Sequence, residues 1–201
     1  MTPTVEICNL ALSHLGQAAV VESVDPPDES FYAQLCVAFW PAAVDTLLEN
    51  HAWGWATKTA ALSLTTEQRP GWAYCFAAPS DCLRLWTVAR DPHCLRQVAY
   101  ERQAGIVAVT PTVICANEPE LYARYTTSEL MPQSISPQFK LALSMHLAAL
   151  LAGPIIKGDQ SLAVAKGLLQ RAEVYAARAA AADANQQNAP VEHMPEWLGV
   201  R

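Results

Sequence analysis

Residues 135–187, ISPQFKLALSMHLAALLAGPIIKGDQSLAVAKGLLQRAEVYAARAAAADANQQ, decide the fold, because they predict two helices joined by a short Gly/Pro break. Ser136 can cap the first helix, and Pro137 suits its first position, where a missing N–H costs nothing. Apolar residues then recur at three- and four-residue spacing, so we expect a helix over about 135–152 that is buried on most sides. Gly153-Pro154 should end this helix, since proline interrupts the helical hydrogen-bond ladder.

The second helix is expected to begin near Asp159 as its N-cap and to run to about Asn185, roughly 40 Å at the usual rise per residue. Its face is mostly alanine, and each alanine buries little apolar area. Two compatible interpretations stay open: the helix packs inside an intramolecular bundle, or its outer half packs on another subunit. For the second interpretation, the predicted subunit–subunit residues are Ala172, Ala176, Ala179 and Ala180.

The composition favours a chain that buries surface against partners. Hydrophobic residues make up 52% of the 201 residues and charged residues only 16%. The net charge is −6 with no basic run, which gives no electrostatic footprint for tight binding of nucleic acid.

No uninterrupted apolar stretch reaches about 18 residues, and the N-terminus lacks the pattern of a secretion signal, so we expect no membrane span and no export. The six scattered cysteines without CxxC spacing are interpreted as reduced, buried thiols of a cytosolic product.

The N-terminal part predicts two more helices. The first covers residues 2–16, with Thr2 as a cap and Gly16 as a left-handed end. The second covers about 28–51, where Pro41 predicts a kink or two abutting helices. Two tryptophans follow in His51-Ala52-Trp53-Gly54-Trp55, and we expect them to anchor the helices to the next region.

From 56 to 126 the helical spacing fades, and β-branched and aromatic residues increase. Gln103-Ala104-Gly105 predicts a hairpin turn. The candidate strands are 60–64, 72–76, 82–89, 96–101, 105–109, 112–116 and 121–126.

The predicted fold class is α+β, mainly α: a four-helix bundle with a long C-terminal Ala-rich helix, an inserted small antiparallel β-sheet and an extended C-terminal tail. The bundle is expected to be one discontinuous domain, 1–55 and 130–187, interrupted by a β-rich region, 56–129. The last residues, 188–201, contain two prolines and an isolated tryptophan and cannot form a core alone. They are either a disordered end or an arm that binds a partner, and for the arm the expected contact residues are Pro190, Met194, Trp197 and Leu198.

Motifs for catalysis or metal binding are poorly supported. The histidines show no HxxxH or HExxH spacing, and the chain has no GxSxG, Walker A or GxGxxG sequence. His146 is interpreted as a core or interface histidine, and the acids Asp25, Asp28 and Glu29 as helix-start capping. No catalytic residue, cofactor or metal is predicted.

The order of several segments resembles one known family. These segments are ICNLALSHLG (7–16), DTLLENHAWGWATK (45–58), PSDCLRLW (79–86), LYARYTT (121–127), SPQFKLALSMHLAALLAGPI (136–155) and the late NQQ (185–187). Together they are similar to the tail tubular protein A family, the head-to-tail connector proteins of short-tailed bacteriophages. The resemblance covers about residues 5 to 187.

The resemblance implies a non-enzymatic connector, or adaptor, in the virion at the head–tail junction, assembled in the host cytoplasm. Such proteins form a ring, typically of twelve copies, beneath the portal protein, and they carry the downstream nozzle or tube protein of the tail. Double-stranded DNA then passes through the ring during ejection without specific binding, and no membrane is involved.

Two other functions remain as alternatives. The first is a glycan-hydrolysing tail protein, which needs two acids held about 5–9.5 Å apart, such as Asp25 and Glu29. The second is a small helical module that binds another protein as a stable dimer.

Overall fold

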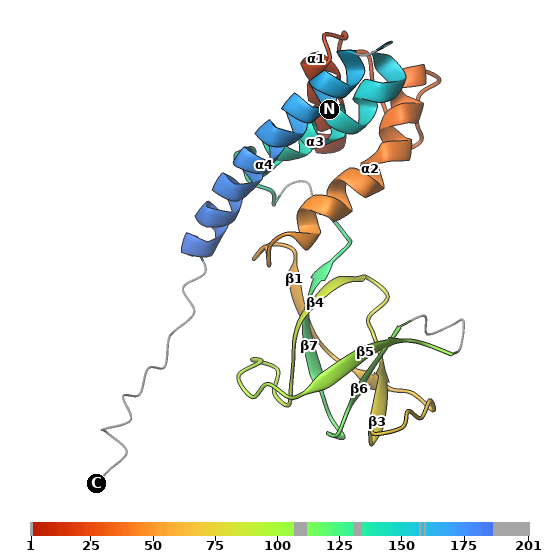
Figure 1. Ribbon diagram of the computed structural model, residues 1–201, viewed down its shortest axis with the longest axis vertical. Helices are drawn as coiled ribbons and strands as arrows, with labels where there is room; N and C mark the ends of the chain where they lie inside the picture. The colour runs from red at the N-terminus through yellow and green to blue at the C-terminus, as the bar shows by residue number, and fades with distance from the viewer. Residues whose placement is uncertain (1, 107–111, 131–133, 157, 159, 187–201) are drawn as a thin grey trace.

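The computed structural model describes residues 2–106, 112–130, 134–156, 158 and 160–186. Its described elements come in blocks: two helices, then seven strands, then two helices. Figure 1 shows the helices gathered at one end of the molecule and the strands at the other. The fold is therefore mixed α/β, as predicted, but neither a mainly α fold nor a four-helix bundle is confirmed.

The first two helices are α1 (Pro3–His14) and α2 (Phe31–Glu49). Gly16 follows α1 with φ +72, as predicted for a left-handed end. Thr2 occupies the N-cap position of α1 as predicted, but its side chain makes no capping hydrogen bond. Ser30 caps α2, since its Oγ accepts a hydrogen bond from the Ala33 N–H at 3.1 Å. α2 continues through Pro41 as a single helix, which excludes two abutting helices.

The last two helices are α3 (Pro137–Ile155) and α4 (Gln160–Gln186). The Ser136 hydroxyl accepts a hydrogen bond from the Phe139 N–H at 3.2 Å, so the predicted start of α3 is confirmed. The predicted end at Gly153-Pro154 is wrong, because α3 includes both residues. A proline in the last turn removes only one hydrogen bond, and the Ile156 N–H still reaches the Ala152 carbonyl at 2.8 Å. Asp159 lies outside the described residues.

α3 is the central helix, and α1, α2 and α4 each pack on it. Its buried residues, among them Phe139, Leu143, Leu147 and Leu151, lie in one hydrophobic core with residues of the other three helices. By length and composition alone, α2 and α3 could each span a membrane. The core explains the apolar character of α3, because 56% of the residues in its most apolar stretch are buried. The cover of α2 is less complete, because Phe31 and Val37 are 58% and 39% exposed although its other large apolar side chains pack on the core at least in part.

The strands form two antiparallel sheets rather than the single sheet that was predicted. The first has the order β1-β7-β4, from β1 (Thr57–Ala61), β7 (Tyr122–Thr127) and β4 (Cys82–Ala89). The second has the order β2-β3-β6-β5, from β2 (Ser63–Leu64), β3 (Tyr74–Ala77), β6 (Thr112–Ala116) and β5 (Tyr100–Ala104). Phe76, Ile114 and Leu121 form a small core of their own with Val88 and Ala116.

The predicted hairpin turn at Gln103-Ala104-Gly105 is wrong. Gln103 and Ala104 belong to β5 and pair with Val113 and Thr112 of β6. The chain therefore reverses after residue 104, and the connection between the two strands extends to residue 111, part of which lies outside the described residues. Register across the sheet, which is a tertiary property, overrides the local turn preference.

Candidate functional site

The segment 51–57 connects the helices to the first sheet, and we call it the helix–sheet joint. Its Trp53 is 1% exposed, and its indole N–H donates a hydrogen bond to the Leu47 carbonyl at 3.1 Å. The Trp53 ring meets the Phe139 ring edge-to-face at 4.8 Å between centroids, and Trp55 meets Phe139 in the same way at 5.0 Å. The prediction that the tryptophans anchor the helices is thus confirmed, with α3 as the anchor point.

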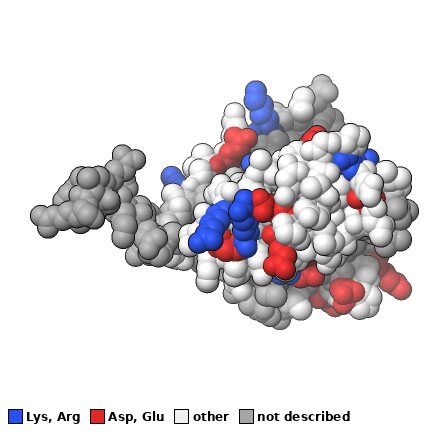
Figure 2. All heavy atoms as spheres, turned by 90° about the horizontal axis from the view of Figure 1, so that it is seen from below, with Lys and Arg blue, Asp and Glu red and all other residues white. Residues whose placement is uncertain are grey.

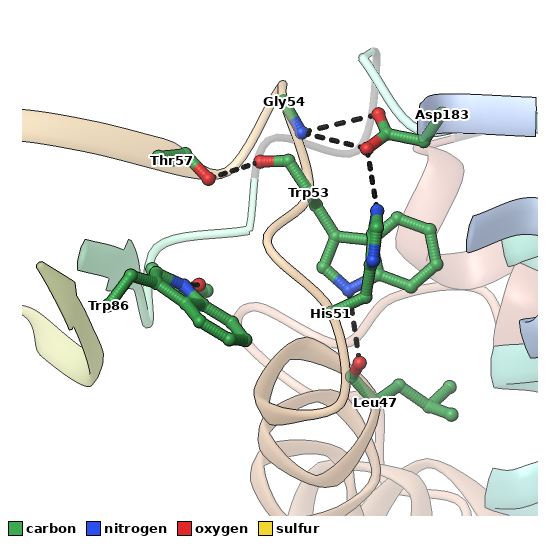
Figure 3. Close-up of polar contacts among 8 residues, drawn as sticks. Leu47, His51, Trp53, Gly54, Thr57, Trp86 and Asp183 are labelled. Carbon is green, nitrogen blue, oxygen red and sulfur yellow. Dashed lines mark hydrogen bonds and ion pairs between the residues drawn. The ribbon is translucent and has the colours of Figure 1, made fainter. Parts of the chain in front are cut away.

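The joint is also held from α4 (Figure 3). The Asp183 carboxylate lies 3.0 Å from the His51 Nε2 and accepts a hydrogen bond from the Gly54 N–H at 3.1 Å. Asp183 therefore ties the C-terminal part of α4 to the segment that leads into β1. Sequence reasoning missed this residue, and its only local signal is a lone acid in an alanine-rich stretch.

A second polar cluster lies where β4 begins. The Asp81 carboxylate accepts hydrogen bonds from Lys58 Nζ at 2.8 Å, from the Thr127 hydroxyl at 2.8 Å and from the Tyr125 hydroxyl at 2.9 Å. Burial alone would raise the pKa of Asp81, but these donors outweigh it and hold the pKa below its ordinary value. Burial and the bond to Asp81 raise the pKa of Tyr125 to about 12. The cluster joins three strands of one sheet, which is a structural role.

A hollow of about 310 Å³ lies between the end of α2 and the inner side of α4, and we call it the inner hollow. Predicted interface residues Ala172, Ala176 and Ala180 line it together with His146 and Glu173. His146 is half-buried, and burial lowers its pKa although Glu173 acts in the opposite direction. The interpretation of His146 as a core or interface histidine is consistent with this position.

The four predicted subunit–subunit alanines do not form one free surface. Ala172 and Ala179 are each 1% exposed and belong to the helical core, so they are unavailable to a neighbour, and their assignment to a subunit contact is corrected. Ala176 and Ala180 are half-buried against the same core. The reason is the helical period, which turns these positions toward α3. The exposed alanines of α4 are Ala163, Ala177, Ala181, Ala182 and Ala184.

The predicted arm residues Pro190, Met194, Trp197 and Leu198 lie outside the described residues. In the acidic stretch, Asp28 accepts hydrogen bonds from the backbone N–H groups of Glu22, Ser23 and Ser30. These bonds, together with the one from the Ser30 side chain as the largest cause, lower the pKa of Asp28 to about 2. Asp28 thus holds the loop before α2, whereas the helix itself is capped by Ser30, so the predicted helix-start capping by these acids is wrong. Asp25 and Glu29 are exposed beside it.

Among the residues that the structure describes, no group of three or more His, Cys, Asp or Glu side chains is placed to hold a metal ion. His14 lies 3.2 Å from the Ser144 hydroxyl, but Ser144 is fully buried and its Oγ also donates to the Leu141 carbonyl, so the pair joins α1 to α3.

Comparison with family models gives no match to this chain, and comparison with curated proteins gives none either. The arguments that follow therefore rest on the residues and their arrangement.

Proposed function

We propose that this chain is the head-to-tail connector subunit of a short-tailed bacteriophage, a non-enzymatic protein that forms a ring beneath the portal protein. In this proposal the ring extends the DNA channel and carries the downstream tail protein. The ordered sequence segments that resemble the connector family motivate it.

The observation that carries the proposal is the apolar surface that α2 leaves exposed. This helix is long and apolar, yet two of its large side chains, Phe31 and Val37, are 58% and 39% exposed. Contiguous apolar surface on a folded chain marks a contact with a partner. A ring supplies such a contact to every copy without leaving a free flank.

The charge of the surface fits passage of DNA. Figure 2 shows one face on which most of the described residues are neither acidic nor basic. The net charge of −6 per chain becomes about −72 in a ring of twelve. Acidic residues that face the channel of the proposed ring would repel phosphates, so DNA would slide through it without being held.

Electron microscopy of the purified chain mixed with the portal protein of the same virion tests the proposal. We expect class averages with an added ring on one face of the portal. Portal particles that stay unchanged at saturating concentrations of the chain would contradict it.

The C-terminal arm gives a second test. Deletion of residues 189–201 should leave the thermal unfolding of the chain unchanged and should weaken its binding to the portal at least tenfold, because the arm supplies the apolar anchors. Surface plasmon resonance on immobilised portal measures this. Equal affinities of the deletion and the full chain would remove the arm from the docking role.

A further inference from the structure

The outer side of α4 has a shallow hollow of about 440 Å³, distinct from the inner hollow. All the residues that line it belong to this one helix: Gly167, Gln170, Arg171, Val174, Tyr175 and Arg178. Val174 is 50% exposed at its floor, and the Arg178 guanidinium lies 5.6 Å from the Tyr175 ring centroid. No described carboxylate lies within ion-pair distance of Arg171 or Arg178. We call this surface the outer hollow, its exposed Val174 the floor and its two arginines the rim.

The start of α2 has the opposite character. Phe31 is its first residue and is 58% exposed, and its ring is supported edge-on by Tyr32 at 5.9 Å between centroids. Glu22, Asp25 and Glu29 lie nearby in sequence and are exposed. This surface carries an exposed aromatic side chain within an acidic stretch of the sequence.

The charges of the two surfaces are complementary. The first 57 residues contain seven Asp and Glu and no Lys or Arg, whereas α4 contains three exposed cations and two acids, Glu173 and Asp183. An exposed aromatic ring also attracts a guanidinium through the negative face of the ring. Phe31 with its acids thus matches both the floor and the rim of the outer hollow.

The two surfaces lie on different parts of one chain. Figure 1 shows α2 and α4 on the two sides of α3, and each packs on α3. A protruding side chain on one side and a matching hollow on the other produce a head-to-tail contact, which repeats from copy to copy. Such contacts close into a ring when the rotation between neighbouring copies allows it.

We infer that the start of α2 in one copy binds the outer face of α4 in the next copy, with Phe31 in the outer hollow between Arg171 and Arg178. The inference rests on the proposed function, since it names the contact that closes the ring. It also moves the lateral contact of α4 from the buried alanines to its exposed side.

Cysteine cross-linking of the full chain tests this contact without the portal. Gln34→Cys, one turn after Phe31, and Gln170→Cys, at the outer hollow, are placed together so that Phe31 and Val174 stay in place. The two partly exposed cysteines are removed as Cys82→Ser/Cys94→Ser, and the protein is oxidised with copper phenanthroline. We expect a ladder of dimers, trimers and larger species on a non-reducing gel, because each copy links to two neighbours. A mixture of the two single variants should stop at a dimer.

Leu95 supplies the matched control for random collision. Leu95 is 77% exposed, so collisions alone would cross-link Gln34→Cys/Leu95→Cys readily. The inference predicts at least a tenfold lower yield for this control. Equal yields, or no ladder from the first pair, would overturn it.

Charge reversal gives an independent test of the contact. Arg171→Glu/Arg178→Glu should abolish the ladder in the same cysteine background, while Arg96→Glu/Arg102→Glu, which changes exposed arginines elsewhere by the same net charge, should leave it. A ladder that survives the first reversal counts against the inference.

The cross-linking result is separable from the proposed function. Rings on the portal without this cross-link would refute the contact and keep the connector. The cross-link without any binding to the portal would keep the contact and refute the connector.

Discussion

At the scale of single residues, Asp183 joins parts of the chain that are far apart in sequence. Its carboxylate, 12% exposed, contacts His51 and Gly54, which precede it by 132 and 129 residues. The contact fixes the helix–sheet joint from the side of α4, while Trp53 fixes it from the side of α3. Because both contacts act on the same short segment, the joint is held on two sides.

Removal of the carboxylate should weaken this arrangement. We expect Asp183→Ala to lower the free energy of unfolding by about 1–2 kcal/mol, since a charged acceptor is lost from two hydrogen bonds. Asp183→Asn should lose less, because its oxygen can still accept from Gly54. Urea denaturation measures both, with Asn185→Ala on the exposed surface of the same helix as the control. Equal stability of Asp183→Ala and wild type would show that the contact is not maintained in solution.

The half-buried histidines make stability depend on pH. Burial, and for His14 also the charge of Arg171, lower the pKa values of His14 and His146 below 6.5. The unfolded chain therefore binds more protons than the folded chain as the pH falls below about 6.5, so stability is complete above that pH and decreases below it.

We expect His14→Gln/His146→Gln to flatten the loss of stability between about pH 7 and pH 5, measured by urea denaturation at each pH. His93→Gln, at an exposed loop position, serves as the control and should keep the wild-type slope. A double variant with the wild-type slope would mean that other groups cause the pH dependence.

Local residue signals predict local structure and little else. Ser136, Pro137 and Gly16 act as the sequence predicts, because capping and left-handed ends depend on neighbours within a few residues. Asp183 and Asp81 were not predictable, because their partners come from distant segments.

At the scale of elements, α4 has two unlike faces. One face turns Leu168, Ala172 and Ala179 into the core, and the other exposes Ala177 and Ala181. The number of alanines alone predicts close packing. Which alanines face the core is decided by the contact with α3, because this contact determines which side of α4 turns inward.

Paired substitutions distinguish the two faces. Ala172→Leu should destabilise the fold by about 1–3 kcal/mol, because added methylenes have no room in a packed core. Ala177→Leu should leave the unfolding temperature within about 1–2 °C of wild type, because the side chain points to the surface. Thermal unfolding followed by circular dichroism measures both. Similar shifts for the two variants would contradict the assignment of the faces.

The predicted boundaries of helices and strands are wrong where tertiary contacts decide them. Pro154 lies inside α3 although proline predicts an end, and Gln103 lies inside β5 although its neighbours predict a turn. The helices were found because their apolar period is strong, whereas the division of the strands into two sheets depends on pairings such as β3 with β6 that span many residues.

At the scale of the whole molecule, the chain combines a helical end with a strand-rich end and leaves Phe31 and Val37 of the apolar helix α2 exposed. In the proposed ring, a neighbouring copy would cover these side chains. The proposed ring would also account for the low share of charged residues, since much of each surface would face a neighbour.

Mass photometry of portal particles before and after addition of the chain tests this central claim most directly. The account predicts a discrete increase of about twelve times the 21.8 kDa chain mass, with few intermediates, because a ring is stable only when closed. An unchanged portal mass, or a continuous distribution of one or two added copies, would contradict it.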